Sequence, residues 1–440
     1  MGKPSVFQGD RMKRIMGILI ISWFASTSFA LEADFTGYLR GGTGVNFEGG
    51  KQQCFYNSGI PANFLRLGNE CDFYSEIAMV FHHKKPDVAD PVYFKTNTRL
   101  VMQGKGTRQW EPAANRNIAQ LEAFVSAGGF SEVPGEFWVG KRFYRDVDVY
   151  IFDWYYYADM SGVGAGWDQI PIGTGKLAIA HLIQSDDKVT ASGDYVETST
   201  GAPVLQALDL RWKEIPVSEN QQLNFWGVYA FAEGSTEGTT VYVPTNGYSL
   251  SARLSGKVGT GFNNFTLMYG QGAMSGLNIY GSVRVPENDT SQNRAWTARV
   301  VEDYHHDISN KWAVILSAAA NTSDNGKDAD SKTNWYEVGV RPIYEISDRF
   351  QLVFEGGFSR INSESEKTGT EYIGDRDLSR VSIAPQISFS KSIWGRPVMR
   401  AYLAHSMWSD SNKSNMAPAT SVFANKNAGT NFGYQFEAWF

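Results

Sequence analysis

The stretch from Gly140 to Gly166 brings cationic, acidic and aromatic side chains close together. Its charged and aromatic members are Lys141, Arg142, Arg145, Asp146, Asp148, Asp153, Trp154, Tyr155, Tyr156, Tyr157 and Asp159. Charge and ring surface interleave without a period of two, so the stretch makes a poor strand with one apolar face. This mixture suits a polar, ring-shaped ligand such as a sugar, whose C–H faces stack on rings while its hydroxyls need charged partners. An ordinary tyrosine-rich surface loop is the alternative interpretation.

Other site chemistries find less support in the chain. His82 and His83 are adjacent, and adjacent residues on a strand point to opposite faces, so they would chelate a metal poorly. Asp148 with Asp146 or Asp153 could form a glycosidase carboxylate pair, but nothing marks one of them as a desolvated acid. No nucleophile motif is present. We therefore expect no metal, no cofactor and no enzymatic activity, with an exported carbohydrate-cleaving enzyme as the alternative.

The N-terminal segment predicts export. Met12–Arg14 is basic, Ile15 to Ala25 is apolar, and Ser28 and Ala30 are small. This order is typical of a secretory signal peptide that is cleaved after Ala30, with translation starting at Met1 or Met12. The apolar run is too short for a spanning helix, which needs about 20 residues. We expect residues 1–30 to be removed from the mature chain.

The remaining 440 − 30 = 410 residues suit either two or three soluble domains or one large β architecture. The chain contains 44 glycines and is 14% aromatic, and its mean hydropathy is negative. This composition is typical of outer-membrane barrels, whose strand residues alternate between lipid and water. No linker or internal repeat divides the chain, which predicts a single transmembrane β-barrel domain over residues 31–440. The net charge of −6 argues against a nucleic-acid partner.

Two cysteines are present, Cys54 and Cys71. In an exported protein, two thiols that flank a loop with Gly59 and Pro61 are expected to form a disulfide. A free reactive thiol or half of a metal site is the alternative.

Period-two alternation places one aromatic residue of several segments on the more polar face. In the C-terminal segment Trp439 lies opposite an apolar face made of Phe432, Tyr434, Phe436, Ala438 and Phe440. The same pattern turns Tyr38, Tyr74 and Phe262 inward, and Trp394 opposite an outward face that includes Ile393 and Met399. Such rings could belong to the girdles at the membrane interface. Their repeated inward parity favours rings that line a polar lumen instead.

Several segments together resemble the maltoporin family of sugar-specific outer-membrane channels, over nearly the whole mature chain. These segments are Asp34–Arg40, Gln52–Phe55, Arg66–Cys71, Gly140–Tyr144, Ser161–Gly166, Gly339–Pro342 and Ser392–Pro397. The resemblance implies an all-β fold, a transmembrane antiparallel β-barrel of about 18 strands in the bacterial outer membrane. It also implies a homotrimer and a loop folded inward as a constriction, which the stretch from Gly140 to Gly166 matches.

The resemblance also implies site residues. An aromatic slide along the channel would consist of Trp110, Tyr74, Tyr38, Trp439, Trp394 and Phe262, with Tyr155 opposite it at the constriction. Trp110 would reach into the channel of a neighbouring subunit. A polar track would consist of Arg40, Arg66, Glu76, Arg116, Asp148 and Asp153. The family usually has an arginine where this chain has Asp146, a departure that would make the constriction more acidic.

The resemblance therefore predicts facilitated diffusion of maltose and maltodextrins, together with ions, along the slide. A porin for another saccharide, sucrose or a β-glucoside, is the alternative within channels. The expected partners are these sugars, outer-membrane lipid and two further copies of the chain, with phage at the extracellular loops as a further candidate.

Overall fold

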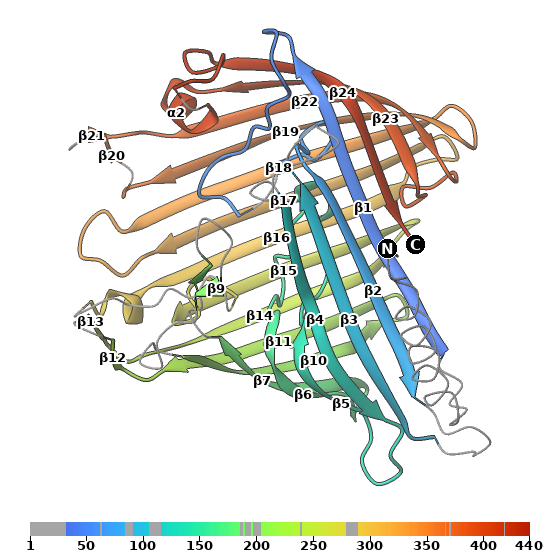
Figure 1. The fold of residues 1–440 in the computed structure, drawn as a ribbon, viewed down its shortest axis with the longest axis vertical. Coiled ribbons are helices and arrows are strands. Elements are labelled where there is room, and N and C mark those ends of the chain that lie inside the picture. The colour runs from blue at the N-terminus through green and yellow to red at the C-terminus, as the bar shows by residue number, and fades with distance from the viewer. Residues whose placement is uncertain are drawn as a thin grey trace, which may run out of the picture.

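The computed structural model describes residues 32–61, 64–83, 91–104, 116–184, 188–189, 195–196, 204–237, 240–278, 289–365, 367–368, 371–417 and 419–440. Within these ranges the chain forms one closed antiparallel β-barrel of 18 strands (Figure 1). The fold expected from the resemblance is thereby confirmed. The proposed signal peptide, residues 1–30, lies outside the described residues.

The barrel strands follow one another in chain order. They are β1 (Glu32–Asn46), β2 (Phe73–His83), β3 (Tyr93–Gly104), β4 (Arg116–Gly128), β5 (Glu136–Arg142), β6 (Gly162–Ile172), β7 (Gly175–Gln184), β10 (Leu205–Ser218), β11 (Gln221–Ala232), β14 (Thr245–Val258), β15 (Gly261–Gly272), β16 (Trp296–Asp307), β17 (Trp312–Asp324), β18 (Lys332–Glu345), β19 (Phe350–Ser363), β22 (Arg376–Ser388), β23 (Val398–Trp408) and β24 (Ala428–Trp439). Three short hairpins stand in the connections: β8 (Lys188–Val189) with β9 (Tyr195–Val196), β12 (Ser235–Glu237) with β13 (Thr240–Tyr242), and β20 (Lys367–Thr368) with β21 (Glu371–Tyr372).

Helical segments in the described residues are short. They are the 3-10 turns η2 (Tyr150–Phe152), η3 (Ser291–Arg294) and η4 (Asp410–Asn412) and the helix α2 (Lys413–Met416). Among the described residues, no helix is long and apolar enough to cross a bilayer.

Each barrel strand pairs with its neighbours in the sequence, and β1 closes the barrel by pairing with β24 (Figure 1). Short turns such as 219–220 and 259–260 join strands at the end where β1 begins and β24 ends, here called the short-turn end. Longer connections such as 47–72, 143–161 and 409–427 lie at the opposite, long-loop end. Closure leaves no free strand edge, which is the requirement for a β structure in lipid.

Apolar side chains alternate outward along the strands, as the sequence predicts. On β24, Phe432, Tyr434 and Phe436 are 40, 60 and 37% exposed, while Gln435 and Glu437 between them are buried inside. Leu267 of β15 is likewise exposed and the neighbouring Thr266 buried. This period of two is the signature of a wall with an apolar outer face and a polar inner one.

The prediction for the segment before β23 is partly wrong. Val398 and Arg400 do face inward, and Met399 faces outward at 59% exposure. Ile393 and Trp394, however, belong to the turn between β22 and β23. Ile393 is 8% exposed and packs in an interior cluster, so it is not part of the outward apolar face. Alternation ceases to govern side-chain direction where the strand ends.

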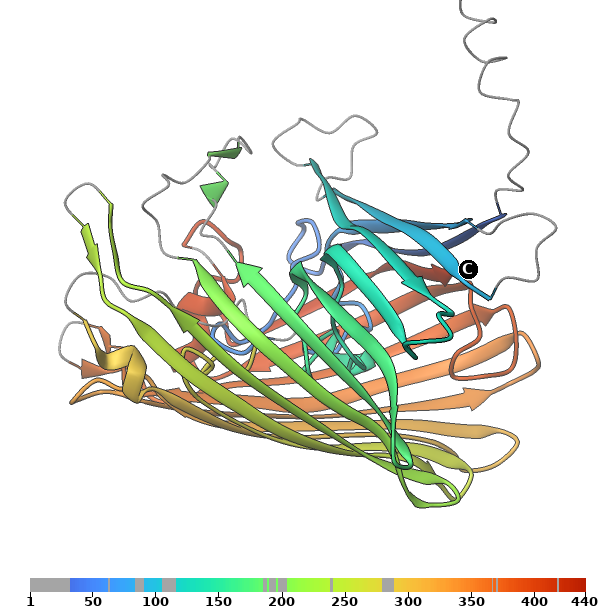
Figure 2. The same ribbon diagram turned by 90° about the horizontal axis from the view of Figure 1, so that it is seen from below.

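Two connections fold into the barrel, residues 47–72 and 143–161 (Figures 1 and 2). Leu65 of the first and Ile151 and Phe152 of the second are fully buried, in one apolar cluster with inward side chains of β16–β23. Tyr157 and other residues of the second loop pack in another cluster, against β7, β10, β11 and β15. The second loop therefore bridges the lumen between two walls, and we call it the constriction loop.

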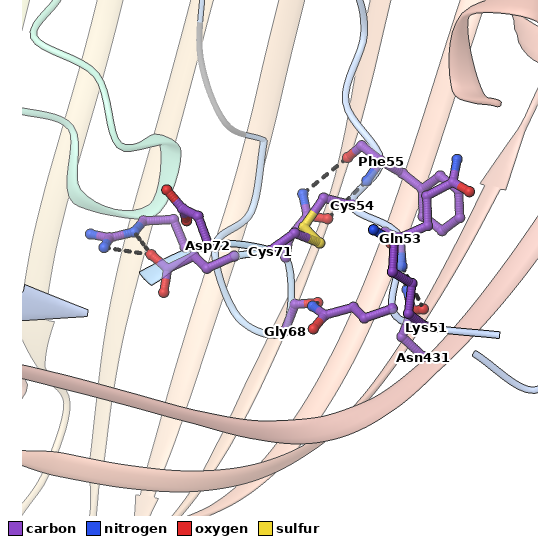
Figure 3. Close-up of a disulfide and its surroundings, with 12 residues drawn as sticks. Lys51, Gln53, Cys54, Phe55, Gly68, Cys71, Asp72 and Asn431 are labelled. Atoms are coloured by element: carbon purple, nitrogen blue, oxygen red, sulfur yellow. Dashed lines mark hydrogen bonds and ion pairs between the residues drawn. A yellow bond between two sulfur atoms is a disulfide. The ribbon is translucent and has the colours of Figure 1, made fainter. Parts of the chain in front are cut away.

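A disulfide between Cys54 and Cys71 joins the two ends of the first inward loop, with Cα atoms 6.0 Å apart (Figure 3). Beside it, Asn431 of β24 accepts a hydrogen bond from the Gln53 backbone N–H and donates one to the Gln53 carbonyl oxygen. The disulfide expected from the sequence is present, and it confines the backbone that carries Arg66.

Candidate functional site

A cavity of about 860 Å³ lies between the constriction loop and the wall formed by β1–β4 and β24. Its lining residues come from the wall, from the first inward loop and from the turn before β23. They are Tyr38, Arg40, Pro61, Arg66, Tyr74, Glu76, Arg99, Glu122, Phe143, Arg145, Asp148, Tyr150, Asp153, Trp154, Tyr155, Asp159, Trp394, Glu437 and Trp439. Ten of the residues predicted for the slide, the constriction and the polar track therefore line one cavity.

One side of this cavity carries a row of aromatic rings. The ring centroids of Tyr74 and Tyr38 are 6.1 Å apart. Tyr38 is paired in register with Trp439 across the β1–β24 closure. The Trp439 and Trp394 centroids are then 6.3 Å apart. The row therefore follows the inner wall toward the short-turn end.

His305 of β16 extends the row beyond Trp394, although the sequence analysis did not select it. Its ring centroid lies 4.8 Å from that of Trp394. His305 is in turn the register partner of Phe262 on β15. Phe262 lies at the short-turn end and is 44% exposed. Phe262 does not line the central cavity and lies beyond His305, on the neighbouring strand.

The same wall also carries polar groups, in the form of ion pairs. Arg40 lies 2.9 Å from an Asp72 oxygen and 3.7 Å from Asp153. Arg66 donates from Nε to Glu70 over 2.7 Å and approaches Asp153 at 3.7 Å. These pairs hold the guanidinium groups in fixed directions, so that donors and acceptors alternate along the wall.

Glu437 of β24 is the meeting point of wall and constriction loop. Although 1% exposed, it accepts hydrogen bonds from the Tyr38 hydroxyl at 3.0 Å and from the Tyr150 hydroxyl at 2.5 Å. Arg66 and Arg396 lie 3.2 and 2.8 Å from its oxygens. A buried carboxylate needs such partners, and here the four come from four different parts of the chain.

A second set of charged residues lies on the part of the wall formed by β2, β3 and β4. Arg99 of β3 bridges Glu76 at 2.8 Å and Glu122 at 2.7 Å. The Tyr74 hydroxyl donates a hydrogen bond to Glu76. Tyr74 and Glu76 thus lie side by side, as alternation on β2 predicts.

The constriction loop supplies the other wall of the cavity. Tyr155 stacks on the Arg145 guanidinium, whose Cζ lies 3.8 Å from the ring centroid. Burial raises the pKa of the Tyr155 hydroxyl, so it is a neutral donor at physiological pH. Burial also raises the pKa of Asp148 above its ordinary value of 3.8, although the nearby positive charge of Arg66 opposes the shift. Asp153 adopts a left-handed backbone conformation, with φ at 55°, at the end of η2.

Not all of the loop's aromatic residues meet the cavity, contrary to the first interpretation of this stretch. Trp154 and Tyr155 line it. Tyr156 and Tyr157 are 3 and 4% exposed and pack in the two apolar clusters that attach the loop to the barrel. Tyr156 also donates a hydrogen bond to Glu337 of β18 over 3.2 Å. Of the four consecutive aromatic residues 154–157, Tyr156 and Tyr157 therefore hold the loop in place.

Asp146, which is expected to make the constriction more acidic, does not line this cavity, and its effect on selectivity stays a prediction. Its carboxylate lies 3.7 Å from Arg253 of β14. Its neighbour Arg145 points into the cavity instead. The charge nearest the cavity at this point of the loop is therefore positive.

Two predicted residues cannot be placed in the site. Trp110 lies outside the described residues. Arg116 begins β4, where it pairs in register with Gly104, and only its backbone is described. Their roles remain predictions.

Several lining residues were missed by sequence reasoning. They are Pro61, Arg99, Glu122, Phe143, Tyr150 and Glu437. His305, which packs against Trp394 without lining the cavity, was missed as well. Alternation could have found Glu437, which shares its face with Trp439. Tyr150 and Phe143 lie in irregular backbone, where no period applies.

Two other hollows lie on the outer face of the barrel. One, of about 920 Å³, is bordered by outward apolar side chains such as Leu210, Leu250 and Leu267. The other, of about 630 Å³, is bordered by Phe73, Met399 and similar residues. Both face the side that lipid covers in an outer-membrane barrel. Among the described residues, no group of three or more His, Cys, Asp or Glu side chains could hold a metal ion.

A sequence model of the LamB porin family matches residues 33–440. The chain belongs to the LamB porin family. A solved structure shows a similar architecture: the outer-membrane channel DcaP of Acinetobacter baumannii is 10% identical and superposes with a TM-score of 0.50, covering 93% of this chain and 97% of its own. OccK1 (OpdK) of Pseudomonas aeruginosa is 10% identical with a TM-score of 0.48, covering 93 and 98%. At this identity the likeness concerns the fold.

Membership of this family and the closed barrel place the protein in the bacterial outer membrane as a porin-type channel. Short turns of such barrels face the periplasm and long loops the exterior. The short-turn end, where β1 begins and β24 ends, is therefore periplasmic. The row of rings leads from Tyr74 on the outer side to Phe262 on the periplasmic side.

Proposed function

We propose that this porin conducts maltose and maltodextrins across the outer membrane by facilitated diffusion. The observation that carries the proposal is the row of rings beside a wall of fixed ion pairs in a single cavity. Glucosyl units would stack on the rings, and their hydroxyls would exchange hydrogen bonds with Arg40, Arg66, Glu76, Asp148 and Asp153. Because neighbouring rings lie about 6 Å apart, a chain could leave one ring as it meets the next.

Such sites must be shallow. A site that held the sugar tightly would block the channel, so conduction needs several weak sites in succession. Tyr155 and the constriction loop would press the sugar against the row. No energy source enters this mechanism, since the sugar gradient alone drives the flux.

The test is ion current through the purified protein in a planar bilayer, titrated with maltohexaose and with sucrose. We expect saturable block, with maltohexaose effective at much lower concentration. Tighter block by sucrose would retain the channel and favour the alternative of a porin for another saccharide. A current that neither sugar affects would leave a general porin. Recovery of intact maltohexaose separates a channel from a carbohydrate-cleaving enzyme.

The row of rings itself is tested by Trp394→Ala. We expect about a tenfold weaker block by maltohexaose, which corresponds to about 1.4 kcal/mol, with nearly unchanged sugar-free conductance. Trp312→Ala is the matched control, because Trp312 has similar exposure (41 against 42%) at the same end but faces outward, against Tyr344. Equal sugar affinity in both variants would contradict the slide.

The contribution of the Tyr74 hydroxyl, at the outer end of the row of rings, is tested by comparing Tyr74→Ala with Tyr74→Phe. The phenylalanine keeps the ring and loses the hydrogen bond to Glu76. If ring stacking contributes most of the sugar binding at this position, block by maltohexaose should be nearly normal in Tyr74→Phe and weaker in Tyr74→Ala.

We further propose a homotrimer in which Trp110 of one chain reaches the channel of the next. The family resemblance supports this arrangement. The mass of the protein in detergent solution, three times that of one chain, is its test.

A further inference from the structure

Four arginines line the central cavity, and three of them are ion-paired. Arg40 pairs with Asp72, Arg66 with Glu70, and Arg99 with Glu76 and Glu122. Within the described ranges of the chain, Arg145 has no carboxylate oxygen within 4 Å and no hydrogen-bonding partner. Its positive charge is therefore not neutralised by direct contact.

Two aromatic rings fix the position of this side chain. The Arg145 Cζ lies 3.9 Å from the ring centroid of Phe143 and 3.8 Å from that of Tyr155. A guanidinium that stacks on rings presents its N–H donors at the edge of its plane. Since both rings line the cavity together with Arg145, these donors are available at the cavity's surface.

Asp148 supplies the complementary group on the same loop. It lines the cavity, and among the described residues no cation approaches its carboxylate within 4 Å. Within the described part of the chain, the constriction loop therefore offers a guanidinium donor without a hydrogen-bonding partner and a carboxylate without a cation in contact. Hydroxyl groups of a saccharide, which both donate and accept, match this combination.

We propose that Arg145 is a specificity-determining residue of the channel, which donates hydrogen bonds from the constriction loop to sugar hydroxyls opposite the aromatic row. The inference rests on the proposed sugar-channel function. Arg145 is the sequence neighbour of Asp146, whose own side chain is directed away from the cavity toward Arg253. A purely structural role, in which Arg145 only fills the space between Phe143 and Tyr155, is the competing explanation.

Two substitutions separate these explanations by separating charge from hydrogen-bond geometry. Arg145→Lys keeps the positive charge but loses the planar fork of donors, and Arg145→Gln loses the charge as well. Reversal potential in a KCl gradient reports the charge, and block by maltohexaose reports sugar binding. Arg349→Gln is the matched control, since Arg349 is exposed at the periplasmic end with its guanidinium 5.3 Å from the Phe389 ring.

We expect both Arg145 variants to need about tenfold more maltohexaose for half-block. The reversal potential should shift toward cation preference in Arg145→Gln only, with Arg145→Lys and Arg349→Gln like wild type. Unchanged half-block in both Arg145 variants would overturn the proposal. A changed sugar-free conductance with equal loss of block by maltohexaose and sucrose would also overturn it, since that pattern indicates a displaced loop.

Failure of the proposed function is distinguishable from failure of this inference. If maltohexaose does not block the wild type, the sugar channel is refuted before any variant is measured. If the wild type is blocked and the Arg145 variants are blocked equally well, only the role of Arg145 is refuted.

Discussion

Among the described residues, two charged side chains of the constriction loop, Arg145 and Asp148, have neither a counter-ion within 4 Å nor a hydrogen bond to another side chain. They differ in environment: Arg145 is held between two rings, whereas Asp148 is desolvated near the carboxylates of Asp153 and Asp303 and the guanidinium of Arg66. At the scale of the single residue, this difference leads to a pH dependence.

We expect the ion selectivity of the channel to change at a pH at which ordinary aspartates remain charged. Burial raises the pKa of Asp148, so on acidification it takes up its proton earlier than an aspartate with the ordinary value of 3.8. Loss of this negative charge should lower the preference for cations. Linkage adds an effect on folding. Because the pKa of Asp148 is higher in the folded than in the unfolded chain, its protonation stabilises the folded state at low pH, and this stabilisation is lost as the pH rises through the folded-state pKa.

Reversal potentials between pH 7 and pH 4, in a KCl gradient, measure the effect. Asp148→Asn should show the selectivity of the acidified wild type and little pH dependence in this range. Asp159→Asn is the control, because Asp159 lines the same cavity but bonds to Ser161. An Asp148→Asn channel that titrates like the wild type would rule out this assignment.

At the scale of the element, the inward loops depend on an unusually close approach to the barrel wall. A Cβ on Gly339 of β18 would meet the Leu65 side chain at 2.7 Å and that of Ile151 at 2.9 Å. Gly357 on the neighbouring strand would meet Leu65 at 3.1 Å. A larger residue at Gly339 would therefore require the Leu65 and Ile151 side chains of the two loops to move.

Gly339→Leu should therefore displace both loops toward the cavity. We expect a lower single-channel conductance and about tenfold weaker maltohexaose block, because rings and donors on the loops leave their positions. Overpacking typically costs about 1–3 kcal/mol, which a closed barrel can tolerate. Val338→Leu, one position away on the outward face, is the control. Normal conductance and block in Gly339→Leu would show that the loops are held elsewhere.

At the scale of the whole molecule, the barrel depends on its apolar exterior. Leu267 is 51% exposed on β15, and Leu250, two residues from its register partner Ala252 on β14, is 59% exposed. In the outer membrane these side chains meet lipid, where a charge near the midplane costs about 2–4 kcal/mol.

Leu267→Arg should destabilise the folded barrel by about that amount, whereas Leu267→Ala should have a smaller effect. The measurement is the temperature at which the detergent-solubilised protein loses its compact electrophoretic mobility. Thr266→Asn, a polar change on the buried inner face next to it, is the control. Equal melting of the Arg and Ala variants would argue against lipid contact at this position.

The wall of the channel follows from local sequence, because alternation along a strand fixes which side chains point inward. Tyr38, Tyr74 and Trp439 are inward for this reason, and Cys54 and Cys71 were paired correctly because both flank one short exported loop. The family resemblance added the closed barrel and the constriction loop. Trp110 and the oligomeric state stay predictions.

The side-chain directions that alternation does not predict depend on contacts between segments far apart in the chain. Asp146 is directed at Arg253, Tyr150 donates to Glu437, and His305 packs against Trp394, although each pair is far apart in the chain. In the irregular backbone of residues 143–161 and of the turn before β23 no period sets side-chain direction. There the direction is set by which strand offers a charge, a ring or a gap, and that arrangement exists only once the barrel has closed.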